Sequence, residues 1–477
     1  MTIDHPANPS QEPPRRAART QPWHRRFGLG AAGFEATKRA FFLGLLTLIL
    51  LIPLGMIGDL LQERESRKSE VESLITGQWG GAQTIVGPIL AVPYRYVTEG
   101  GTDANPRTAV SHLFFLPKHL DIEASARTER RAKSIYQVLV YGGTAKLTGS
   151  FAGLSAPRPD VAPEMIDWSG ARLLIGIADI SAVRSLSLAL GSLPPVGADA
   201  VQQESMLSSS LSAATPLGAA DLAGPVDFAV ALEFRGSSSL GFAPLADQTA
   251  VSIDADWPHP DFSGRSLPDD RTITGRGFTA RWSLGALTRA FPSSWRVGEV
   301  NPENLWNTAV GVGFVEPGDV HQQTDRILKY GVLVIGLTFA TIFINGLIAR
   351  GPTGRRVHPV QYLLVGAALC LFYLLLLSLS EQIGFGPAYV LASLADIALI
   401  AWYAWRTMSR RLGYATAALL AAVQAYMYVL LQMEDYALLS GTAALFLALL
   451  AAMIATRNVD WYRAGDDRPA GAAPRLP

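Results

Sequence analysis

Five long apolar runs near the C-terminus constrain the fold of this chain more than any other feature. They are Tyr330–Ala349, Val360–Ser380, Ala388–Ala404, Leu412–Leu431 and Tyr436–Thr456. A helix needs about 20 residues to cross a hydrocarbon core of about 30 Å, and each run is close to that length. Because lipid offers no hydrogen bonds to the backbone, such runs fold as helices. The sequence therefore predicts a C-terminal bundle of membrane-spanning helices.

The breaks between these runs alternate between basic and acidic residues. The first and third breaks carry arginines (Arg350, Arg355, Arg356, Arg406, Arg410 and Arg411), whereas Glu381 follows the second run and Glu434–Asp435 follow the fourth. Cytoplasmic loops carry an excess of Lys and Arg. A further apolar run, Ala40–Gly58, follows a basic tail and is predicted to be an uncleaved anchor. Six spans with both termini in the cytoplasm satisfy all of these signals.

Composition supports a membrane protein and argues against other classes. Charged residues make up 17% of the chain and the mean hydropathy is +0.22, whereas a soluble domain carries about 25% charge. Forty basic and forty acidic residues give a net charge of zero, so we expect no nucleic-acid partner. The single cysteine, Cys370, allows no disulfide within the chain and no cysteine-based metal site.

Between the anchor and the C-terminal runs, the apolar pattern changes to period-two alternation in short pieces. The pieces are Ile89–Val97, His112–Leu116, Ile135–Ala145, Ala171–Ile177, Val226–Phe234, Thr249–Ala255 and Gly277–Leu284. Turn-forming residues separate them, which favours many short antiparallel strands in a sandwich. Gly191–Ala220, rich in Ser, Ala and Gly, is predicted to be a loop or an insert. The orientation of the anchor places this region outside, in the periplasm.

The predicted organisation has five parts. A disordered cytoplasmic tail covers 1–38, the first transmembrane helix 39–60, the β-rich exoplasmic domain 61–326, a five-helix bundle 327–456 and a second cytoplasmic tail 457–477. The predicted fold class is a polytopic α-helical membrane protein of six spans, one N-terminal and five C-terminal, with a large inserted mainly-β, sandwich-like domain. The charged stretch after the anchor, Gln62–Ser73, contains good helix formers, so we expect the first helix to continue beyond the membrane.

Several motifs resemble the CreD family of bacterial inner-membrane proteins. They are SIYQVLVYG (134–142), WPHPDFSG (257–264), GFTARW (277–282), AFPSSW (290–295), GVGFVEPGDVHQQTDR (311–326), HPVQYLLVG (358–366), LSEQIGFGPAY (379–389) and YVLLQMEDYALLSG (428–441). The resemblance extends from the first span to Tyr462. It implies an inner-membrane location and a role in cell-envelope integrity and in a two-component response to envelope or nutrient conditions. It implies no enzymatic activity.

The densest polar cluster of the β-rich domain contains Trp257, His259 and Asp261, with Asp254 and Asp256 just before them. One histidine among carboxylates suits a divalent cation or acid–base chemistry. The favoured interpretation is a turn fixed by two prolines, with the indole packed and the carboxylates solvated. Neither a Gly-x-Ser-x-Gly elbow nor a glycine-rich phosphate loop occurs in the sequence. We therefore predict no catalytic, cofactor or metal site.

Asp396 lies near the middle of the fourth predicted span. An ionised carboxylate there costs about 2.5–3.5 kcal/mol, so the side chain should face protein or water. Two interpretations stay open. Asp396 is either part of an ion or proton relay with Gln424, Tyr426 or Asn345, or it is a protonated or hydrogen-bonded packing residue.

Three further carboxylates, Glu381, Glu434 and Asp435, lie at the outer ends of predicted spans. One hypothesis is that they seat the β-rich domain on the bundle or line an outward-facing cavity. The alternative is ordinary solvation at the membrane interface.

Two functional hypotheses follow from these features. The preferred one is a non-enzymatic inner-membrane protein that supports envelope integrity or the envelope-stress response, and whose periplasmic domain binds an envelope protein or a cell-wall or lipid component. The alternative is a transporter or exporter of a small or lipidic molecule through the bundle, with Asp396 on its path. A weaker third hypothesis is a hydrolase that uses Asp256, His259 and Asp261.

Overall fold

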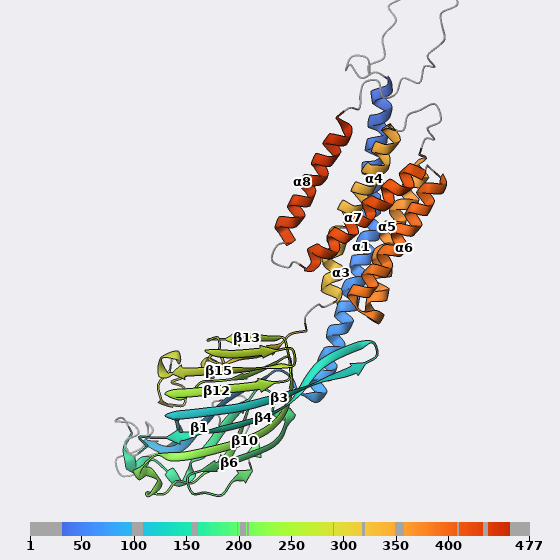
Figure 1. The fold of residues 1–477 in the computed structure, drawn as a ribbon. Helices are drawn as coiled ribbons and strands as arrows, with labels where there is room; N and C mark the ends of the chain where they lie inside the picture. The colour runs from blue at the N-terminus through green and yellow to red at the C-terminus, as the bar shows by residue number, and fades with distance from the viewer. Residues whose placement is uncertain are drawn as a thin grey trace, which may run out of the picture. The chain divides into compact units, whose positions relative to one another are not determined.

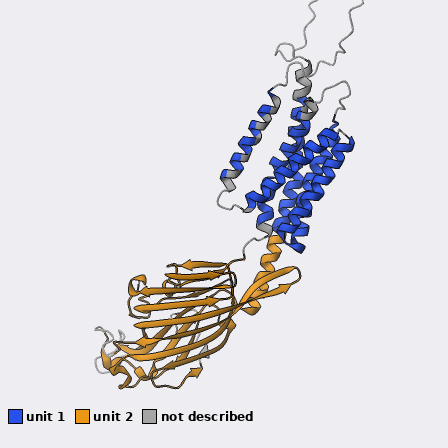
Figure 2. Ribbon diagram, viewed as in Figure 1, with its two compact units in different colours: residues 1–63, 320–477 blue, residues 64–319 orange. Residues whose placement is uncertain are grey.

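The chain forms two compact units (Figure 2), one of residues 1–63 and 320–477 and the other of residues 64–319. The computed structural model describes residues 31–97, 108–154, 161–197, 199–200, 207, 209–289, 291–316, 320–348, 357–407, 410–432 and 437–457. The first unit is helical and the second is built from β-sheets (Figure 1). In sequence, the β-rich unit is inserted into the helical unit.

The helical unit contains several helices that are long and apolar enough to cross a membrane. Its elements are the part of α1 (Ala31–Trp79) before residue 64, α3 (Val320–Lys329), α4 (Gly331–Ile348), α5 (Pro359–Ile383), α6 (Phe385–Thr407), α7 (Arg410–Gln432) and α8 (Ala437–Thr456). Within the described residues, four helices meet the length and hydropathy needed, at Ala40–Trp79, Pro359–Ile383, Phe385–Thr407 and Arg410–Leu431. The number rises to five if α3 and α4 count as one bent span. This confirms a multi-span helical protein but does not establish all six predicted spans.

One prediction about the spans differs from the structure and another agrees with it. The second predicted span, Tyr330–Ala349, is not one straight helix, because α3 and α4 meet at Tyr330 with a bend of 43°. The first helix does continue beyond its apolar run, as its charged stretch predicted, and it ends at Trp79.

Helix α1 packs closely against α5 because small residues face it. A Cβ on Gly366 would lie 2.2 Å from Leu50 Cδ1, and the Cys370 thiol lies 3.9 Å from the Leu50 carbonyl oxygen. Small side chains let helix backbones approach, and close packing is the main attraction between helices in lipid. The lone cysteine is thus a buried packing residue of the α1–α5 contact.

The β-rich unit consists of two sheets. The nine-stranded sheet has the order β13 (Pro260–Gly264), β17 (Val310–Phe314), β11 (Ser239–Phe242), β1 (Gln83–Val97), β5 (Arg172–Ile177), β9 (Ser210–Ala214) and β8 (Asp199–Ala200), with β2 (Thr108–Phe115) on β1 and β16 (Ser294–Arg296) on β2. The eight-stranded sheet has the order β14 (Asp270–Thr274), β15 (Gly277–Gly285), β12 (Gln248–Ala255), β3 (His119–Lys133), β4 (Tyr136–Phe151), β10 (Val226–Ser237), β6 (Val183–Leu190) and β7 (Val196–Gly197).

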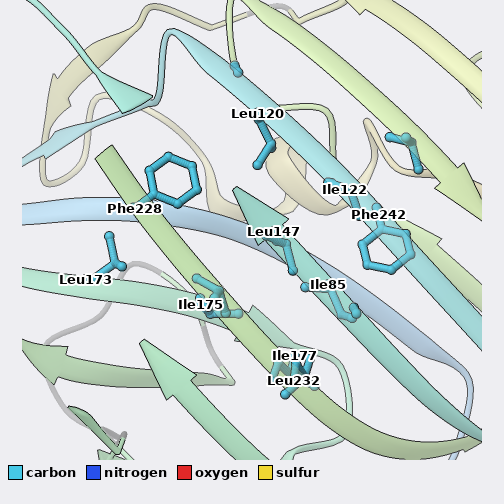
Figure 3. Close-up of a cluster of buried hydrophobic side chains, with 14 of the residues drawn as sticks. Ile85, Leu120, Ile122, Leu147, Leu173, Ile175, Ile177, Phe228, Leu232 and Phe242 are labelled. Atoms are coloured by element: carbon cyan, nitrogen blue, oxygen red, sulfur yellow. The ribbon is translucent and has the colours of Figure 1, made fainter. Parts of the chain in front are cut away.

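The main core lies between the inner faces of the two sheets. Figure 3 shows side chains of the nine-stranded sheet, such as Ile85 and Ile175, together with side chains of the eight-stranded sheet, such as Leu147 and Phe228.

The outer face of the nine-stranded sheet is covered too. A second apolar cluster packs Val86, Ile89 and Leu174 of that face under Phe291, Trp295, Val300 and Leu305. The short helix α2 (Pro302–Trp306) belongs to this cover.

The sandwich-like architecture agrees with the sequence prediction, but three details were wrong. Two neighbouring pairs, β1 with β11 and β3 with β12, are parallel rather than antiparallel. Strand β1 begins at Gln83 rather than Ile89, because a register shift between Val86 and Ile89 carries it past a glycine and a proline. Finally, 191–220 is not only a loop: it contains β7, β8 and β9, and β9 pairs with β5 inside the nine-stranded sheet.

Strands β3 and β4 continue as a two-stranded ribbon beyond both of their neighbours. Pairing of β3 with β12 stops at Ala126, and pairing of β4 with β10 stops at Val140, while β3 and β4 stay paired up to Lys133 and Tyr136. An isolated two-stranded ribbon is only marginally stable in water. Contacts at its base must therefore hold this ribbon in place.

One face of the ribbon holds the end of α1. The indole of Trp79 lies 4.4 Å from the Arg131 guanidinium carbon and 3.8 Å from that of Arg235 in β10, measured to the ring centroid. Its Nε1 donates to the Tyr141 carbonyl oxygen at 3.1 Å. Each cation–π contact contributes about 0.5–2 kcal/mol, depending on solvent exposure. The chain thus enters the β-rich unit at a fixed point on the eight-stranded sheet.

The other face of the ribbon holds the segment that leaves the β-rich unit. Arg130 pairs with Glu316 at 3.5 Å and lies 5.9 Å from the Trp257 ring centroid. Trp257 in turn donates from Nε1 to the Val315 carbonyl oxygen at 3.0 Å. Successive side chains of a strand point to opposite faces, so adjacent arginines reach the incoming and the outgoing segments.

The segment that follows α1 is joined to the nine-stranded sheet by Asp179. Its carboxylate accepts from the Gly81 N–H at 3.1 Å and from the Ser181 N–H and hydroxyl. Burial raises the pKa of Asp179, but these hydrogen bonds outweigh burial and hold the pKa below its ordinary value. The carboxylate therefore stays charged at neutral pH and fixes the start of β1.

We predict that two glycines of β4 respond very differently to alanine. A Cβ on Gly149 would lie 2.0 Å from the His119 carbonyl oxygen, whereas a Cβ on Gly142 would meet nothing within 4 Å. Gly149→Ala should lower the free energy of unfolding by about 1–3 kcal/mol, because overpacking forces the strands apart. Gly142→Ala should be neutral within about 0.5 kcal/mol. Denaturant unfolding of the purified full chain in detergent checks both, and equal effects would contradict the assigned register.

Candidate functional site

The buried carboxylate of the bundle is Asp396, on helix α6. Its side chain is 5% exposed, and its Oδ2 accepts a hydrogen bond of 3.0 Å from Nε2 of Gln424 on α7. Gln424 is itself 4% exposed. Side-chain hydrogen bonds between membrane helices contribute about 0.6–2 kcal/mol each. This pair therefore joins α6 and α7 through their buried faces.

Tyr389 completes the contact between the two helices. Its hydroxyl donates to the Gln424 backbone carbonyl oxygen at 2.7 Å, and its ring stacks on Tyr428 with centroids 5.4 Å apart. Tyr389, Ser393 and Asp396 are spaced four and three residues apart, so they share one face of α6. All three are buried. The polar face of α6 thus lies against α7.

Some polar atoms of this cluster have no hydrogen-bond partner among the described residues. They are Asp396 Oδ1, Gln424 Oε1, the hydroxyl of Ser393 and the hydroxyl of Tyr373, a fully buried residue of α5. Tyr373 also lies close enough to Asp396 and Tyr389 to interact with them electrostatically. A buried acceptor without a donor costs about 1–3 kcal/mol. The cluster therefore holds buried acceptors and hydroxyl groups that are not paired with one another.

The structure selects one of the three partners considered for Asp396. Gln424 contacts it directly, whereas Tyr426 is two positions further along α7 and so projects about 200° away around the helix. The side chain of Asn345 lies outside the described residues. Sequence reasoning did not single out Tyr389 or Ser393, although their spacing from Asp396 marks one helical face.

The three carboxylates expected at the outer ends of spans are only partly described. Glu381 lies in the last turn of α5 and is half-buried. Glu434 and Asp435 lie outside the described residues, between α7 and α8.

The cluster around Trp257 has structural contacts. Trp257 is buried, holds Val315 through its indole N–H, and packs edge-on against His259 with centroids 6.2 Å apart. His259 and Asp261 are both exposed, and Asp261 faces Gly313 in the β13–β17 ladder. The indole therefore anchors the outgoing segment of the β-rich unit.

The carboxylates before Trp257 bind neighbouring strands. Asp256 accepts from the Thr128 N–H at 2.7 Å and from the Thr128 hydroxyl at 2.9 Å. Asp254 accepts from the Thr279 hydroxyl at 3.2 Å and lies 3.4 Å from Arg127. Within the part of the chain that the structure describes, no three His, Cys, Asp or Glu side chains are grouped closely enough to hold a metal ion.

The outer face of the eight-stranded sheet is a broad polar surface, which we call the open face. It is formed by the outward positions of six strands, among them Glu123, Thr144, Lys146, Ala229, Ala231, Glu233, Ser185, Ser187, Ser252, Asp254, Thr279 and Arg281. These side chains are exposed or half-buried. Small hydroxyl and methyl groups alternate with charges of both signs, as in the cross-strand pair of Glu123 and Lys146. The open face is thus exposed and rich in hydrogen-bonding groups.

Comparison with known proteins gives two matches that cover most of the chain. The family described as inner membrane protein CreD matches residues 35–462. The inner membrane protein CreD of Escherichia coli (strain K12) is 32% identical over 431 residues, which are 87% of this chain and 91% of the relative. Both α6 and α7, and the whole β-rich unit, lie within the matched range.

We expect Asp396 and Gln424 to be energetically coupled. In a double-mutant cycle of Asp396→Ala and Gln424→Ala, the coupling free energy should be about 0.6–1.7 kcal/mol, the range for hydrogen-bonded pairs between membrane helices. Unfolding of the full chain in mixed micelles by increasing fractions of denaturing detergent measures it. Thr338→Ala is the control, because this hydroxyl bonds to its own helix, at the Val334 carbonyl oxygen. Its effect should add to that of Asp396→Ala within about 0.5 kcal/mol.

Proposed function

The chain belongs to the CreD family of inner membrane proteins, and we propose that it is a non-enzymatic protein that supports the integrity of the cell envelope. The match confirms the family resemblance predicted from the sequence motifs. In this proposal the helical unit anchors the protein in the inner membrane. The β-rich unit binds an envelope protein or a cell-wall or lipid component.

The observation that carries this proposal is the open face of the eight-stranded sheet. The nine-stranded sheet is covered on its outer side by the second apolar cluster, whereas the open face is exposed along β12, β3, β4 and β10. Exposed hydroxyls and paired charges suit the recognition of a hydrated partner through many weak polar contacts. Binding there would need little change in the sandwich, because the core lies on the opposite side of these strands.

The membrane topology is part of the proposal. Six spans, with α8 as the last, would leave both termini in the cytoplasm and the β-rich unit in the periplasm. The basic breaks after the second and fourth predicted spans support this orientation, because arginine-rich loops stay in the cytoplasm. The β-rich unit would then face the compartment that contains the cell wall.

A second candidate function is transport of a small or lipidic molecule through the bundle. The observation that favours it is the buried cluster of Asp396, Gln424 and Tyr389, because ionisable residues inside membranes often mark pathways for ions or substrates. This candidate places the essential chemistry in the helical unit rather than on the open face.

We predict that filling the open face abolishes envelope protection. Ala231 is exposed on this face, on β10 between Lys146 of β4 and Ser187 of β6. In a bacterial strain lacking its own family member, Ala231→Trp should leave stress survival and dye uptake at the level of the empty strain. Full-length chain should restore both. The matched control is Ala286→Trp, on an exposed alanine beyond the open face, and it should behave as wild type.

The same assay separates the two candidate functions. Normal protection by Ala231→Trp, together with loss of protection by a well-expressed Asp396→Asn, would reject the binding role and favour transport. The reverse pattern would reject transport. Membrane levels of every variant are measured in parallel, so that loss of protein is not mistaken for loss of function.

We also predict the orientation of the β-rich unit from cysteine labelling. The single native thiol, Cys370, is buried and gives no background. In cells with a permeabilised outer membrane, a membrane-impermeant maleimide should label Ala231→Cys, while Lys38→Cys should react only after the inner membrane is broken. The opposite pattern would place the β-rich unit in the cytoplasm.

A further inference from the structure

At the α6–α7 contact, the carboxyl group of Asp396 and the side-chain amide of Gln424 share one hydrogen bond, but one oxygen of each group has no hydrogen-bond partner among the described residues. Gln424 Nε2 donates to Asp396 Oδ2 at 3.0 Å. The remaining oxygens of the same two planar groups, Asp396 Oδ1 and Gln424 Oε1, have no donor among the described residues. Both residues are more than nine-tenths buried, so bulk water does not complete the pair.

An ionised carboxylate cannot satisfy this arrangement. A carboxylate only accepts hydrogen bonds, and so does an amide oxygen, so neither free oxygen offers the other a proton. A carboxylic acid and a primary amide, in contrast, each carry a hydrogen-bond donor beside an acceptor, so the two groups can pair through two hydrogen bonds. The acid O–H donates to the amide oxygen while the amide N–H donates to the acid carbonyl oxygen. One added proton would therefore satisfy both unpartnered atoms.

We propose that Asp396 is a proton-binding site, with the proton on Oδ1 and shared with Oε1 of Gln424. The carboxylate accepts this proton from a hydronium ion of the solution, which becomes water, and the product is an un-ionised acid paired to the amide by two hydrogen bonds. The α6–α7 contact then contains no net charge. Release of the proton leaves two acceptors without a donor in the core of the bundle, so proton release and loosening of this contact are linked.

The surroundings of the pair offer no competing cation within the described residues. No described basic side chain forms an ion pair with Asp396, and the nearest described arginine of its own helix, Arg406, is in the last turn of α6, about 15 Å along the axis. The titratable groups near Asp396 are the phenols of Tyr373 on α5 and Tyr389 on α6. The Tyr389 hydroxyl already donates to the Gln424 backbone. A proton is therefore the simplest ligand that fits.

Infrared spectroscopy tests the proposal directly. The full chain in lipid nanodiscs is compared with Asp396→Asn at neutral pH, and the difference spectrum should contain the C=O band of one un-ionised carboxylic acid that disappears in the variant. The matched control is Glu381→Gln, whose difference spectrum should leave the Asp396 band unchanged. A difference spectrum that shows the two bands of an ionised carboxylate would overturn the proposal.

The pH dependence of stability provides a second test that does not depend on the infrared assignment. The folded chain would hold a proton that the unfolded chain releases above the ordinary aspartate pKa of about 4, so the stability of the wild type should fall as pH rises above about 4, until the folded chain releases the proton too. The variant Asp396→Asn keeps both edges of the pair, with an amide N–H in place of the acid O–H, and its denaturation midpoint should not show this fall. Parallel profiles for the two proteins would contradict the proposed site.

A third variant guards against misfolding of Asp396→Asn. Gln424→Leu removes the acceptor for the proton but leaves the carboxyl, so the acid band should persist and shift to the frequency of an acid with a weaker hydrogen bond. An unshifted band would show that the proton is not shared with Gln424 and would reject the paired geometry.

Discussion

The packing of the Trp79 indole against two arginine guanidinium groups is the contact on which the β-rich unit depends. A sheet domain inserted between helices needs its first and last segments held, because both connect to elements of another unit. Here Trp79 lies against Arg131 and Arg235 at the start, and Arg130 holds Glu316 at the end. Since Arg130 and Arg131 are adjacent in β3, one ribbon orders both segments. The long pairing of β3 with β4 therefore serves the connections as well as the sheet.

Sequence reasoning identified the elements with strong periodic signals. The apolar runs predicted α5, α6 and α7 well, because a 20-residue apolar stretch has few other folds. Strand β3 was missed because its inward positions after Leu120 and Ile122 are the alanines Ala124 and Ala126, which give weak contrast with the charged residues between them. Strand β9 was missed for a similar reason: its Ser and Ala residues resemble a loop, and only pairing with β5 buries them.

The candidate site was predictable in part. Asp396 is conspicuous in sequence because a charge is costly in an apolar run. Its partner could not be fixed, since the choice among Gln424, Tyr426 and Asn345 depends on how α6 and α7 are rotated against each other. Tyr389 illustrates the same limit: its ring looks like packing, and its bond to the Gln424 backbone exists only in the assembled bundle. In the β-rich unit, Trp257 looked like one part of a compact turn, but its partner Val315 lies far along the chain.

The ribbon of β3 and β4 also restricts how the length of this chain can change. Arg130 and Arg131 reach different segments only because they lie on opposite faces of one strand. One residue inserted between Ala126 and Arg130 would exchange the two faces and disconnect both ends of the unit together. Two inserted residues would restore the faces but move both arginines beyond their partners. Insertions and deletions among descendants of this chain should therefore avoid the base of the ribbon and accumulate at its turn, around Ser134 and Ile135.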